Sequence, residues 1–320
     1  MTSHSEHITT VAFTTPLPLE GFKRLSNGFR LIMPDSNGNI PPCANAEILV
    51  STFDFPVPKT LIDSYPNLRL IANFGVGFNN IDLDACRERG IRVTNTPQPV
   101  IEPTAELAFA LMIAIARRTA ELDRRMRLGS AEPIGVMNNL SHSLYGKTLG
   151  IIGMGRIGQA LARRAVASGM KIIYHNRHQL PVEIEQTYNA HYVDFQTLLQ
   201  DSDYVSLNLP YTPDVHHLIG KPELGMMRRT AYLINTARGA HIDEQALAEA
   251  LQAHVIAGAA LDVYEHEPAI TPALLQLDNV VLSPHAGTGT WEGRIDMCEN
   301  VTDNILAFAD NQINKMNIVL

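Results

Sequence analysis

The sequence predicts an α/β protein with one doubly wound parallel-sheet domain and a second, smaller α/β domain. Between about residues 147 and 283, short apolar runs alternate with helical patterns at a regular spacing. Such runs are typical of parallel strands buried on both faces. A glycine-rich stretch joins the first of these strands to a helix. The chain has 320 residues, which suits two domains of roughly 150 residues each.

The first hundred residues carry weaker strand signals and predict the smaller domain, which we expect to be flavodoxin-like. Its predicted strands are Ile8–Phe13, Arg30–Met33, Ile48–Val50, Leu70–Asn73 and Arg92–Thr94. Prolines 97, 99 and 103 indicate a hinge at the exit of this domain. We expect a final helix over Trp291–Ala309 to return to it. The smaller domain would then comprise residues 1–100 and 290–320, and the larger domain residues 101–289.

The larger domain is expected to open with a helix over Pro103–Arg118. This helix is apolar on nearly every side, which indicates a core helix or an interface helix. Further helices are predicted over Ile157–Ser168, closed by Gly169, and over Asp243–Ala253, with Asp243 as the N-cap. The predicted strands are Thr148–Ile152, Lys171–Tyr174, His191–Val193, Tyr204–Leu209, Ala231–Asn235, Ile256–Val263 and Val280–Ser283.

Composition narrows the class of protein. Hydrophobic residues make up 45% of the chain and charged residues 18%, which is typical of a globular core. The net charge of −8, without a basic run, argues against a nucleic-acid partner. Cys43, Cys86 and Cys298 are too few and too far apart for a disulfide framework or a zinc site. The polar Met1–Val11 is no signal peptide, and the longest apolar run, Leu107–Ala116, is too short to cross a membrane. We therefore expect a soluble cytoplasmic protein with no membrane partner.

The glycine-rich stretch has the spacing of a dinucleotide-binding (Rossmann) fingerprint. Gly153 permits a tight turn, Gly155 lets the backbone approach a pyrophosphate, and Gly158 lets helix and strand pack closely. The N–H groups at the start of the following helix, at Arg156 and Ile157, supply donors and a positive dipole. A glycine-rich turn that binds nothing is the alternative, but the strand and helix on either side favour the fingerprint.

The end of the next strand predicts which cofactor binds. NAD sites usually carry Asp or Glu there, about twenty residues after the glycines, to hold the ribose 2′-hydroxyl. The chain has no carboxylate over residues 171–178 and carries Asn176 and Arg177 instead. A guanidinium binds a 2′-phosphate well, so we expect NADP(H), with NAD(H) as the second choice. The alternative is that Arg177 is only a solvated surface charge.

Three charged or titratable side chains follow the ends of three predicted strands. Arg238, Glu267 and His285 should converge, because ligands bind at the carboxyl ends of parallel strands. A guanidinium can anchor a substrate carboxylate. An imidazole can protonate a keto oxygen as hydride arrives, and an adjacent carboxylate stabilises the imidazolium. No spacing of His, Asp and Glu resembles a metal site, and we interpret the remaining histidines as surface or loop residues: His142, His216, His217, His241, His254 and His266.

With these motifs in order, the chain resembles the D-isomer-specific 2-hydroxyacid dehydrogenase family over essentially its whole length. The matching segments are Gly75–Asp82, Pro103–Leu107, Gly153–Gly158, Asn235–Gly239, Ala259–Val263 with Glu267-Pro268, and Ser283–Gly287. The resemblance implies hydride transfer between a nicotinamide and a small 2-oxo or 2-hydroxy acid, in a homodimer that would explain the apolar helix after Pro103.

The resemblance also implies roles for particular residues. The catalytic arginine, glutamate and histidine fall on Arg238, Glu267 and His285. Backbone N–H groups of Val76 and Gly77 would hold the substrate carboxylate, together with Arg238 and His285. The cofactor contacts would comprise the glycine loop and Asn176–Arg177, with Thr104, Leu209, Pro210, Thr236, Ala237, Asp262 and Gly287.

Within the family, the chain looks most like the glyoxylate/hydroxypyruvate reductase and 2-ketogluconate reductase branch. Two departures touch the substrate pocket. The chain reads Gly287-Thr288-Gly289-Thr290 where many members have Gly-Ser-x-Thr, and Arg127–Tyr145 lacks the tryptophan that a partner subunit often lends. No regulatory extension follows the last helix, unlike in longer phosphoglycerate dehydrogenases.

Two other functions compete with this interpretation. A dinucleotide-sensing binding protein or corepressor could use the same fold, but it would not need a proton donor paired with a carboxylate. A dehydrogenase of formate or phosphite would need extra polar or charged groups in the first-domain loop, where Asn73–Asn80 offers only Phe, Val, Gly and Asn.

Overall fold

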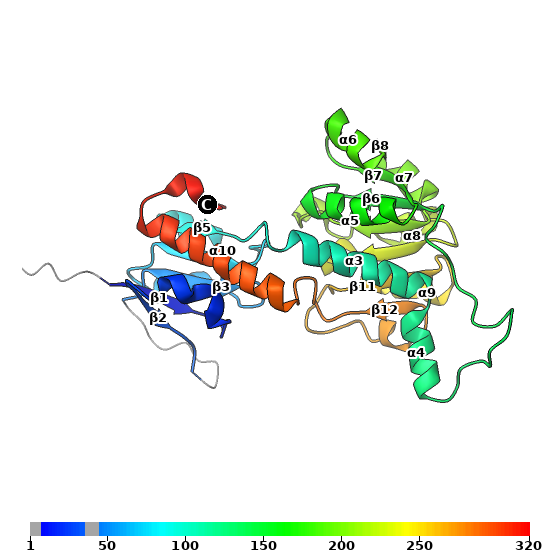
Figure 1. The fold of residues 1–320 in the computed structure, drawn as a ribbon, viewed down its shortest axis with the longest axis horizontal. Coiled ribbons are helices and arrows are strands. Elements are labelled where there is room, and N and C mark those ends of the chain that lie inside the picture. The colour runs from blue at the N-terminus through cyan, green and yellow to red at the C-terminus, as the bar shows by residue number, and fades with distance from the viewer. Residues whose placement is uncertain (1–7, 36–44) are drawn as a thin grey trace, which may run out of the picture. The chain divides into compact units, whose positions relative to one another are not determined.

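The computed structural model describes residues 8–35 and 45–320, and these form two compact units. Unit 1 comprises residues 1–100 and 288–320, and unit 2 comprises residues 101–287 (Figure 1). The polar segment 1–7 and Cys43 lie outside the described residues. Cys86 and Cys298 are buried free thiols. Among the described residues, no helix is both long and apolar enough to span a membrane.

Unit 1 contains a five-stranded parallel sheet with the order β2-β1-β3-β4-β5. This is the flavodoxin-like order 2-1-3-4-5. Helix α10 packs with the helical turn 19–25 on one side of the sheet and reaches β4, so unit 1 is discontinuous in sequence. The strands are β1 (Thr9–Phe13), β2 (Phe29–Ile32), β3 (Ile48–Thr52), β4 (Leu70–Phe74) and β5 (Arg92–Thr94), and the helices are α1 (Lys59–Asp63), α2 (Leu83–Glu88) and α10 (Trp291–Ala309).

Unit 2 contains a seven-stranded parallel sheet with the order β12-β11-β10-β9-β6-β7-β8. The chain order reverses between β6 and β9, which makes the carboxyl end of β6 the switch point where ligands bind in such sheets. The glycine loop follows β6 directly. The strands are β6 (Thr148–Ile152), β7 (Lys171–His175), β8 (Ala190–Tyr192), β9 (Tyr204–Leu207), β10 (Tyr232–Asn235), β11 (Gly258–Leu261) and β12 (Val280–Leu282).

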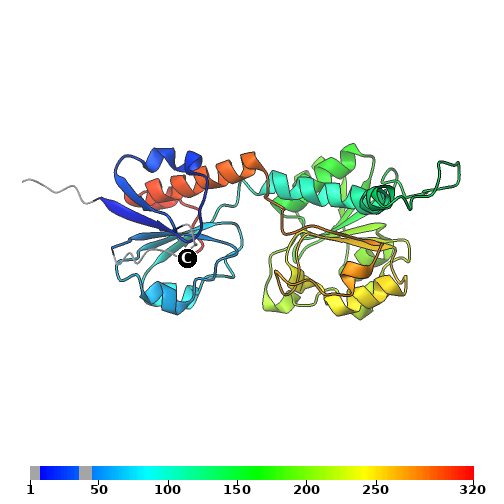
Figure 2. The same ribbon diagram turned by 90° about the horizontal axis from the view of Figure 1, so that it is seen from below.

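Helices cover both faces of the unit 2 sheet (Figure 2). On one face, α3 packs on α5 and crosses β10, β11 and β12. On the other face, α7, α8 and α9 enclose a second apolar core. The helices of this unit are α3 (Ile101–Ala116), α4 (Thr119–Arg127), α5 (Arg156–Ala167), α6 (Val182–Tyr188), α7 (Phe195–Asp201), α8 (Lys221–Met226) and α9 (Glu244–Gln252).

Local signals in the sequence explain several of these boundaries. Asp243 caps α9 by accepting a hydrogen bond from the Ala246 N–H at 2.9 Å, as predicted. Helix α3 begins two residues earlier than expected, at Ile101. Strand β11 covers only Gly258–Leu261 of the predicted strand Ile256–Val263, because its pairing with β10 begins at Gly258 and ends at Leu261.

The apolar helix α3 is a core helix. Leu111, Met112 and Ile115 are buried within unit 2, and Ile113 is the one large apolar side chain of this helix that is 37% exposed. Packing on α5 and the sheet accounts for its buried apolar residues. A group of exposed apolar side chains lies in the segment after α4, which projects from unit 2 (Figure 1).

Candidate functional site

Arg238, Glu267 and His285 follow three neighbouring strands of unit 2. Strands β10, β11 and β12 lie side by side, and their last residues pair in register from Asn235 to Leu261 to Leu282. The three following loops therefore leave the sheet at one edge. The sequence predicted this convergence, and the charges of Arg238 and Glu267 do act on each other.

The imidazole of His285 is held by the carboxylate of Glu267. His285 Nδ1 lies 2.7 Å from Glu267 Oε2, and Glu267 Oε1 accepts the Tyr264 N–H at 2.9 Å. Burial raises the pKa of Glu267, but the hydrogen bonds from His285 and Tyr264 outweigh it, so this pKa lies below its usual range. The carboxylate thus stays charged into the acidic range, and the stability it confers is lost only as the pH falls through the lowered pKa. Nδ1 faces Glu267, so Nε2 is the ring nitrogen on the far side of the imidazole from the carboxylate.

The guanidinium of Arg238 is partly buried beside this pair. Burial lowers the pKa of Arg238, and the charge of Glu267 opposes that shift. Arg238 Nη1 donates to the Ala237 carbonyl at 2.6 Å, while the buried Asn235 side chain donates to the Arg238 carbonyl at 2.8 Å. A Cβ on Gly239 would lie 1.8 Å from the Tyr264 carbonyl carbon. Only glycine therefore lets the Arg238 loop approach the loop that leads to Glu267.

Asp262 fixes the loop that carries His285. Its backbone carbonyl accepts the His285 N–H at 2.8 Å, and its two carboxylate oxygens accept the Ala286 N–H at 2.7 Å and the Gly287 N–H at 2.8 Å. His285 adopts a φ of +53°, in the left-handed region that residues other than glycine adopt only uncommonly. Three hydrogen bonds to one buried residue hold the backbone in this conformation. The sequence analysis assigned Asp262 to the cofactor and did not foresee this anchoring.

Gly153, Gly155 and Gly158 in the loop after β6 are each explained by their surroundings. Gly153 has a φ of +92°, and a Cβ there would lie 2.8 Å from the Asn208 backbone. A Cβ on Gly158 would lie 2.6 Å from the Gly153 carbonyl oxygen, so this glycine allows α5 to approach the turn. A Cβ on Gly155 would meet nothing within 4 Å. The protein itself therefore leaves the space above Gly155 open, which fits a bound pyrophosphate.

Neighbouring segments brace this loop. Asn176 Oδ1 accepts the Met154 N–H at 2.7 Å, and the His175 carbonyl accepts the Gly153 N–H at 3.0 Å. Leu209 lies against Gly153, and Pro210 beyond it is exposed. Asn176 thus shapes the glycine loop in addition to standing where the sequence analysis placed a cofactor contact.

Arg177 has a carboxylate neighbour that comes from another loop. Its Nη2 lies 3.1 Å from Asp214 Oδ2 and 3.5 Å from Thr212 Oγ1. Both Arg177 and Asp214 are mostly exposed, and exposed ion pairs of this kind contribute little to stability. A ligand phosphate can therefore replace Asp214 as the partner of Arg177.

Other predicted cofactor residues gather near Gly287. A Cβ on Gly287 would lie 3.2 Å from Asp262 Oδ2 and 3.6 Å from the Thr104 hydroxyl. Thr236 is buried, and its hydroxyl has no hydrogen-bond partner within the described chain. Buried hydroxyls are nearly always partnered, so this orphan fits a ligand contact. Ala237 is also buried and follows directly.

Val76 and Gly77 lie in unit 1, in the loop after β4. Asn73 Nδ2 donates to the carbonyls of Gly75 and Gly77 at 3.2 and 2.8 Å, and Asn95 Nδ2 donates to the Val76 carbonyl at 3.0 Å. These hydrogen bonds fix the conformation of the loop, and the peptide N–H groups of Val76 and Gly77 can then donate to a ligand. In residues 8–35 and 45–320, no acceptor contacts either N–H. Successive free N–H groups suit an anion such as a carboxylate.

The surroundings of several titratable side chains could not be predicted from the sequence. His241 was interpreted as a surface or loop residue, but it is fully buried, and burial lowers its pKa to about 4. His217 is paired with Glu265 at 2.6 Å rather than lying alone on the surface. Arg294 of α10 is partly buried over the rings of Phe53 and Phe74, at 5.9 and 5.6 Å. It gives unit 1 a cation that Asn73–Asn80 does not supply.

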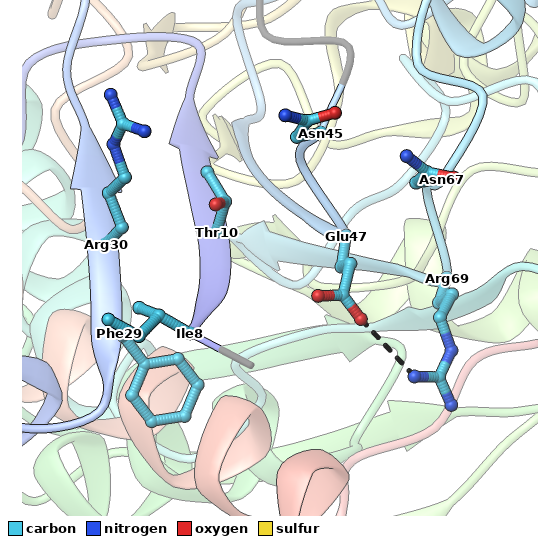
Figure 3. Close-up of a pocket in the computed structure, with 8 residues that line it drawn as sticks. All are labelled: Ile8, Thr10, Phe29, Arg30, Asn45, Glu47, Asn67 and Arg69. Atoms are coloured by element: carbon cyan, nitrogen blue, oxygen red, sulfur yellow. Dashed lines mark hydrogen bonds and ion pairs between the residues drawn. The ribbon is translucent and has the colours of Figure 1, made fainter. Parts of the chain in front are cut away.

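A pocket of about 720 Å³ in unit 1 holds none of the predicted site residues. Figure 3 shows it lined by Thr10, Arg30 and the pair Glu47–Arg69, whose charged atoms lie 3.4 Å apart. These residues stand at the amino ends of β1–β4, whereas Val76 and Gly77 follow a carboxyl end. The pocket therefore belongs to the opposite edge of the sheet.

Comparison with known proteins gives consistent matches. The model of the NAD binding domain of D-isomer specific 2-hydroxyacid dehydrogenases matches residues 109–287. The chain is 44% identical over 313 residues to a glyoxylate reductase of Thermococcus litoralis, covering 95% of this chain and 94% of that protein. It is similar to the crystal structure of a glyoxylate reductase from Paecilomyes thermophila, with a TM-score of 0.85, 34% identity and 97% and 98% of the two chains covered. It is also similar to an NADPH-dependent glyoxylate/hydroxypyruvate reductase from Sinorhizobium meliloti in complex with NADP and malonate, with a TM-score of 0.82, 30% identity and 94% of each chain covered.

Proposed function

Because the chain belongs to the D-isomer specific 2-hydroxyacid dehydrogenase family, we propose that it is an NADP-preferring reductase of a small 2-oxo acid such as glyoxylate or hydroxypyruvate. The family makes it an oxidoreductase that uses a nicotinamide dinucleotide and acts on 2-oxo acids. The proposed product is the D-2-hydroxy acid. The observation that carries the catalytic assignment is the 2.7 Å contact between His285 and Glu267, beside the charge of Arg238.

Substrate binding is assigned to the Arg238 guanidinium, which follows β10, and to the backbone N–H groups of the loop after β4. In this proposal, the Arg238 fork binds the substrate carboxylate through two charge-assisted hydrogen bonds. Within unit 1, the N–H groups of Val76 and Gly77 are assigned to a substrate carboxylate. The glycine loop would hold the cofactor pyrophosphate, Arg177 its 2′-phosphate, and Thr104, Thr236, Asp262 and Gly287 its nicotinamide side.

Catalysis is assigned to the His285–Glu267 pair. The bound cofactor supplies the hydride. His285 Nε2 donates a proton to the keto oxygen as negative charge builds there, and Glu267 stabilises the imidazolium that is present before the transfer. After the step His285 is neutral, with the proton on Nδ1 still held by Glu267. Asp262 contributes by keeping the imidazole at one place.

A substrate panel tests the proposed function. Glyoxylate, hydroxypyruvate, pyruvate, 2-ketogluconate and phenylpyruvate are each assayed with NADPH and with NADH. We expect turnover of the smallest 2-oxo acids and higher kcat/KM with NADPH. Binding of NADPH without turnover of any 2-oxo acid would favour the dinucleotide-sensing alternative. Formate and phosphite, assayed with NADP⁺, are included because the partly buried Arg294 could bind a small anion.

Cofactor preference should depend on Arg177 and Asp214 in opposite directions. Arg177→Ala removes a charge-assisted contact to the 2′-phosphate, so we expect KM for NADPH to rise about 10–100-fold and KM for NADH to stay nearly unchanged. Asp214→Asn removes the carboxylate that competes for Arg177, so KM for NADPH should fall. Steady-state kinetics with both cofactors measures this. Equal losses with NADPH and NADH in Arg177→Ala would contradict the assignment.

The pH dependence of reduction should move when the charge of Glu267 is removed. Glu267→Gln keeps the shape of the side chain but no longer stabilises the imidazolium of His285. Reduction needs that imidazolium, so the alkaline limb of the kcat/KM profile should shift to lower pH while turnover persists at acidic pH. The shift is measured from kcat/KM determined between about pH 5 and about pH 10. An unchanged alkaline limb would show that Glu267 does not act through His285.

We infer that the enzyme forms a homodimer through the segment after α4. Large apolar side chains of this segment are more than half exposed, which is unusual for a surface left in water. These side chains are Leu128, Ile134, Val136, Met137, Leu140 and Tyr145. Light scattering should give about twice the chain mass of 35.3 kDa, and Ile134→Asp with Val136→Asp should give monomers. A monomeric unmutated protein would refute the dimer.

A further inference from the structure

We propose that His216, His217 and Glu265 form a binding site for a transition-metal ion such as Zn²⁺. One ligand atom from each of the three side chains lies within 4.8 Å of the others. The sequence analysis expected no metal site, because Glu265 is 48 residues from His217 along the chain. The fold brings the loop after β9 against the loop after β11, and so completes a set of two imidazoles and one carboxylate.

The chemistry of the three side chains suits a borderline metal ion. Imidazole nitrogen and carboxylate oxygen are usual Zn²⁺ ligands, and three protein ligands leave one coordination position for water. Imidazole also suits Ni²⁺ and Cu²⁺, whereas Mg²⁺ and Ca²⁺ prefer oxygen alone. The same set is a poor site for an anion, because Glu265 carries negative charge.

The ligand positions need only a small adjustment. His217 Nε2 and Glu265 Oε1 lie 2.6 Å apart and share a proton. In a tetrahedral zinc site, ligand atoms about 2.1 Å from the metal are about 3.4 Å from one another. Replacing the shared proton by Zn²⁺ therefore requires the two atoms to part by less than one ångström. Since the proton must leave, binding should weaken as the pH falls.

The backbone holds the two histidines together. His217 has a φ of +50°, in the left-handed region, and the rings of His216 and His217 stack with centroids 4.0 Å apart. The His217 N–H donates to the Ala240 carbonyl at 2.8 Å, which fixes this turn. The Tyr211 hydroxyl lies 3.3 Å from His216 Nδ1. This contact engages Nδ1 of His216, so Nε2 is the ring nitrogen we assign to the metal.

The backbone that carries the carboxylate is also fixed. The side chain of Glu265 is 17% exposed, and its backbone N–H donates to Glu244 Oε1 at 2.6 Å. Glu244 is buried and also accepts the Thr271 hydroxyl at 2.6 Å. Both halves of the site are therefore ordered without a metal, and a bound ion would connect residues 211–217 to residues 264–267.

The test uses the full-length, tag-free protein after treatment with a chelator. Calorimetric titration with Zn²⁺ should show one ion bound per chain, and Co²⁺ should give the visible absorption of a site with fewer than six ligands. Zn²⁺ should also raise Tm, because it binds the folded chain. His217→Ala and Glu265→Gln should each weaken Zn²⁺ binding by more than about tenfold, since even the loss of an outer partner costs about 10–100-fold.

Controls separate this site from adventitious binding. His191→Ala removes an exposed histidine outside the cluster and should leave Zn²⁺ affinity unchanged. Glu265→Gln keeps side-chain volume, and its circular dichroism and Tm without metal report whether it folds. Absence of a Zn²⁺ titration in the unmutated protein, or equal affinity in Glu265→Gln and His191→Ala, would overturn the proposal. These readouts involve no turnover, so they stand apart from the proposed reductase activity.

Discussion

His285→Ala should lose most of kcat for the reduction of 2-oxo acids while NADPH binding stays nearly unchanged. The imidazole acts only as charge builds on the keto oxygen, so its removal affects the transition state more than the bound cofactor. General acid catalysis is typically worth about 10²–10⁴-fold, and we expect a loss in that range. Stopped-flow or steady-state rates with glyoxylate and fluorescence titration with NADPH measure the two quantities separately.

The left-handed backbone at His285 calls for a second variant. Alanine is strained at a φ of +53° and could lower kcat by disturbing the loop alone. Asparagine tolerates this conformation and can still donate a hydrogen bond to Glu267, but it cannot serve as a proton donor. His285→Asn should therefore lose as much kcat as His285→Ala with a Tm close to that of the unmutated enzyme. Near-normal reduction by both variants would overturn the mechanism.

Arg238→Ala should lower kcat/KM by about 10²–10⁴-fold. The guanidinium is proposed to make two hydrogen bonds to the substrate carboxylate, and each bond to a charged group is worth about 1.5–3 kcal/mol. Because the carboxylate is present in both the ground state and the transition state, KM should rise as well as kcat fall. Steady-state kinetics over a wide range of glyoxylate concentrations separates the two parameters.

Arg238→Lys is the matched control for this anchor. Lysine keeps the positive charge beside Glu267 but lacks the planar fork, so it should recover only part of the lost kcat/KM. Guanidinium ion added to Arg238→Ala should restore activity further than added ammonium does. If Arg238→Ala keeps its KM for every 2-oxo acid in the panel, the carboxylate is anchored elsewhere.

The sequence contained enough information to predict the sheet and to group the three side chains that we propose as catalytic. Parallel strands buried on both faces are continuous apolar runs, and β6 begins and ends at the predicted residues, as do β5 and helix α10. Carboxyl ends of such strands meet at one edge, so Arg238, Glu267 and His285 could be grouped before any coordinates existed. The roles of these residues, and the preference for NADP(H), remain predictions for the experiments above.

The contacts that shape the site could not be inferred in the same way. Asp262 accepts hydrogen bonds from backbone N–H groups. Almost every residue has such a donor, so the sequence does not show which ones Asp262 contacts. The approach of Gly239 to Tyr264, and the pairing of Arg177 with Asp214, depend on how two distant loops leave the sheet. The burial of His241 likewise depends on how its loop packs, because the local sequence pattern predicts a surface loop.

The anchoring of His285 by Asp262 has a consequence for anyone who transplants this chemistry into another protein. A graft of Ser283–Gly287 alone would carry the imidazole but leave behind the acceptor of three successive N–H groups. The recipient backbone would relax to an ordinary φ, and the ring would point elsewhere. The smallest transferable unit for the His285–Glu267 pair is therefore two strands: β11 with Asp262 and Glu267, and β12 with its loop. A histidine that appears in the sequence within one short motif is, in three dimensions, positioned by two.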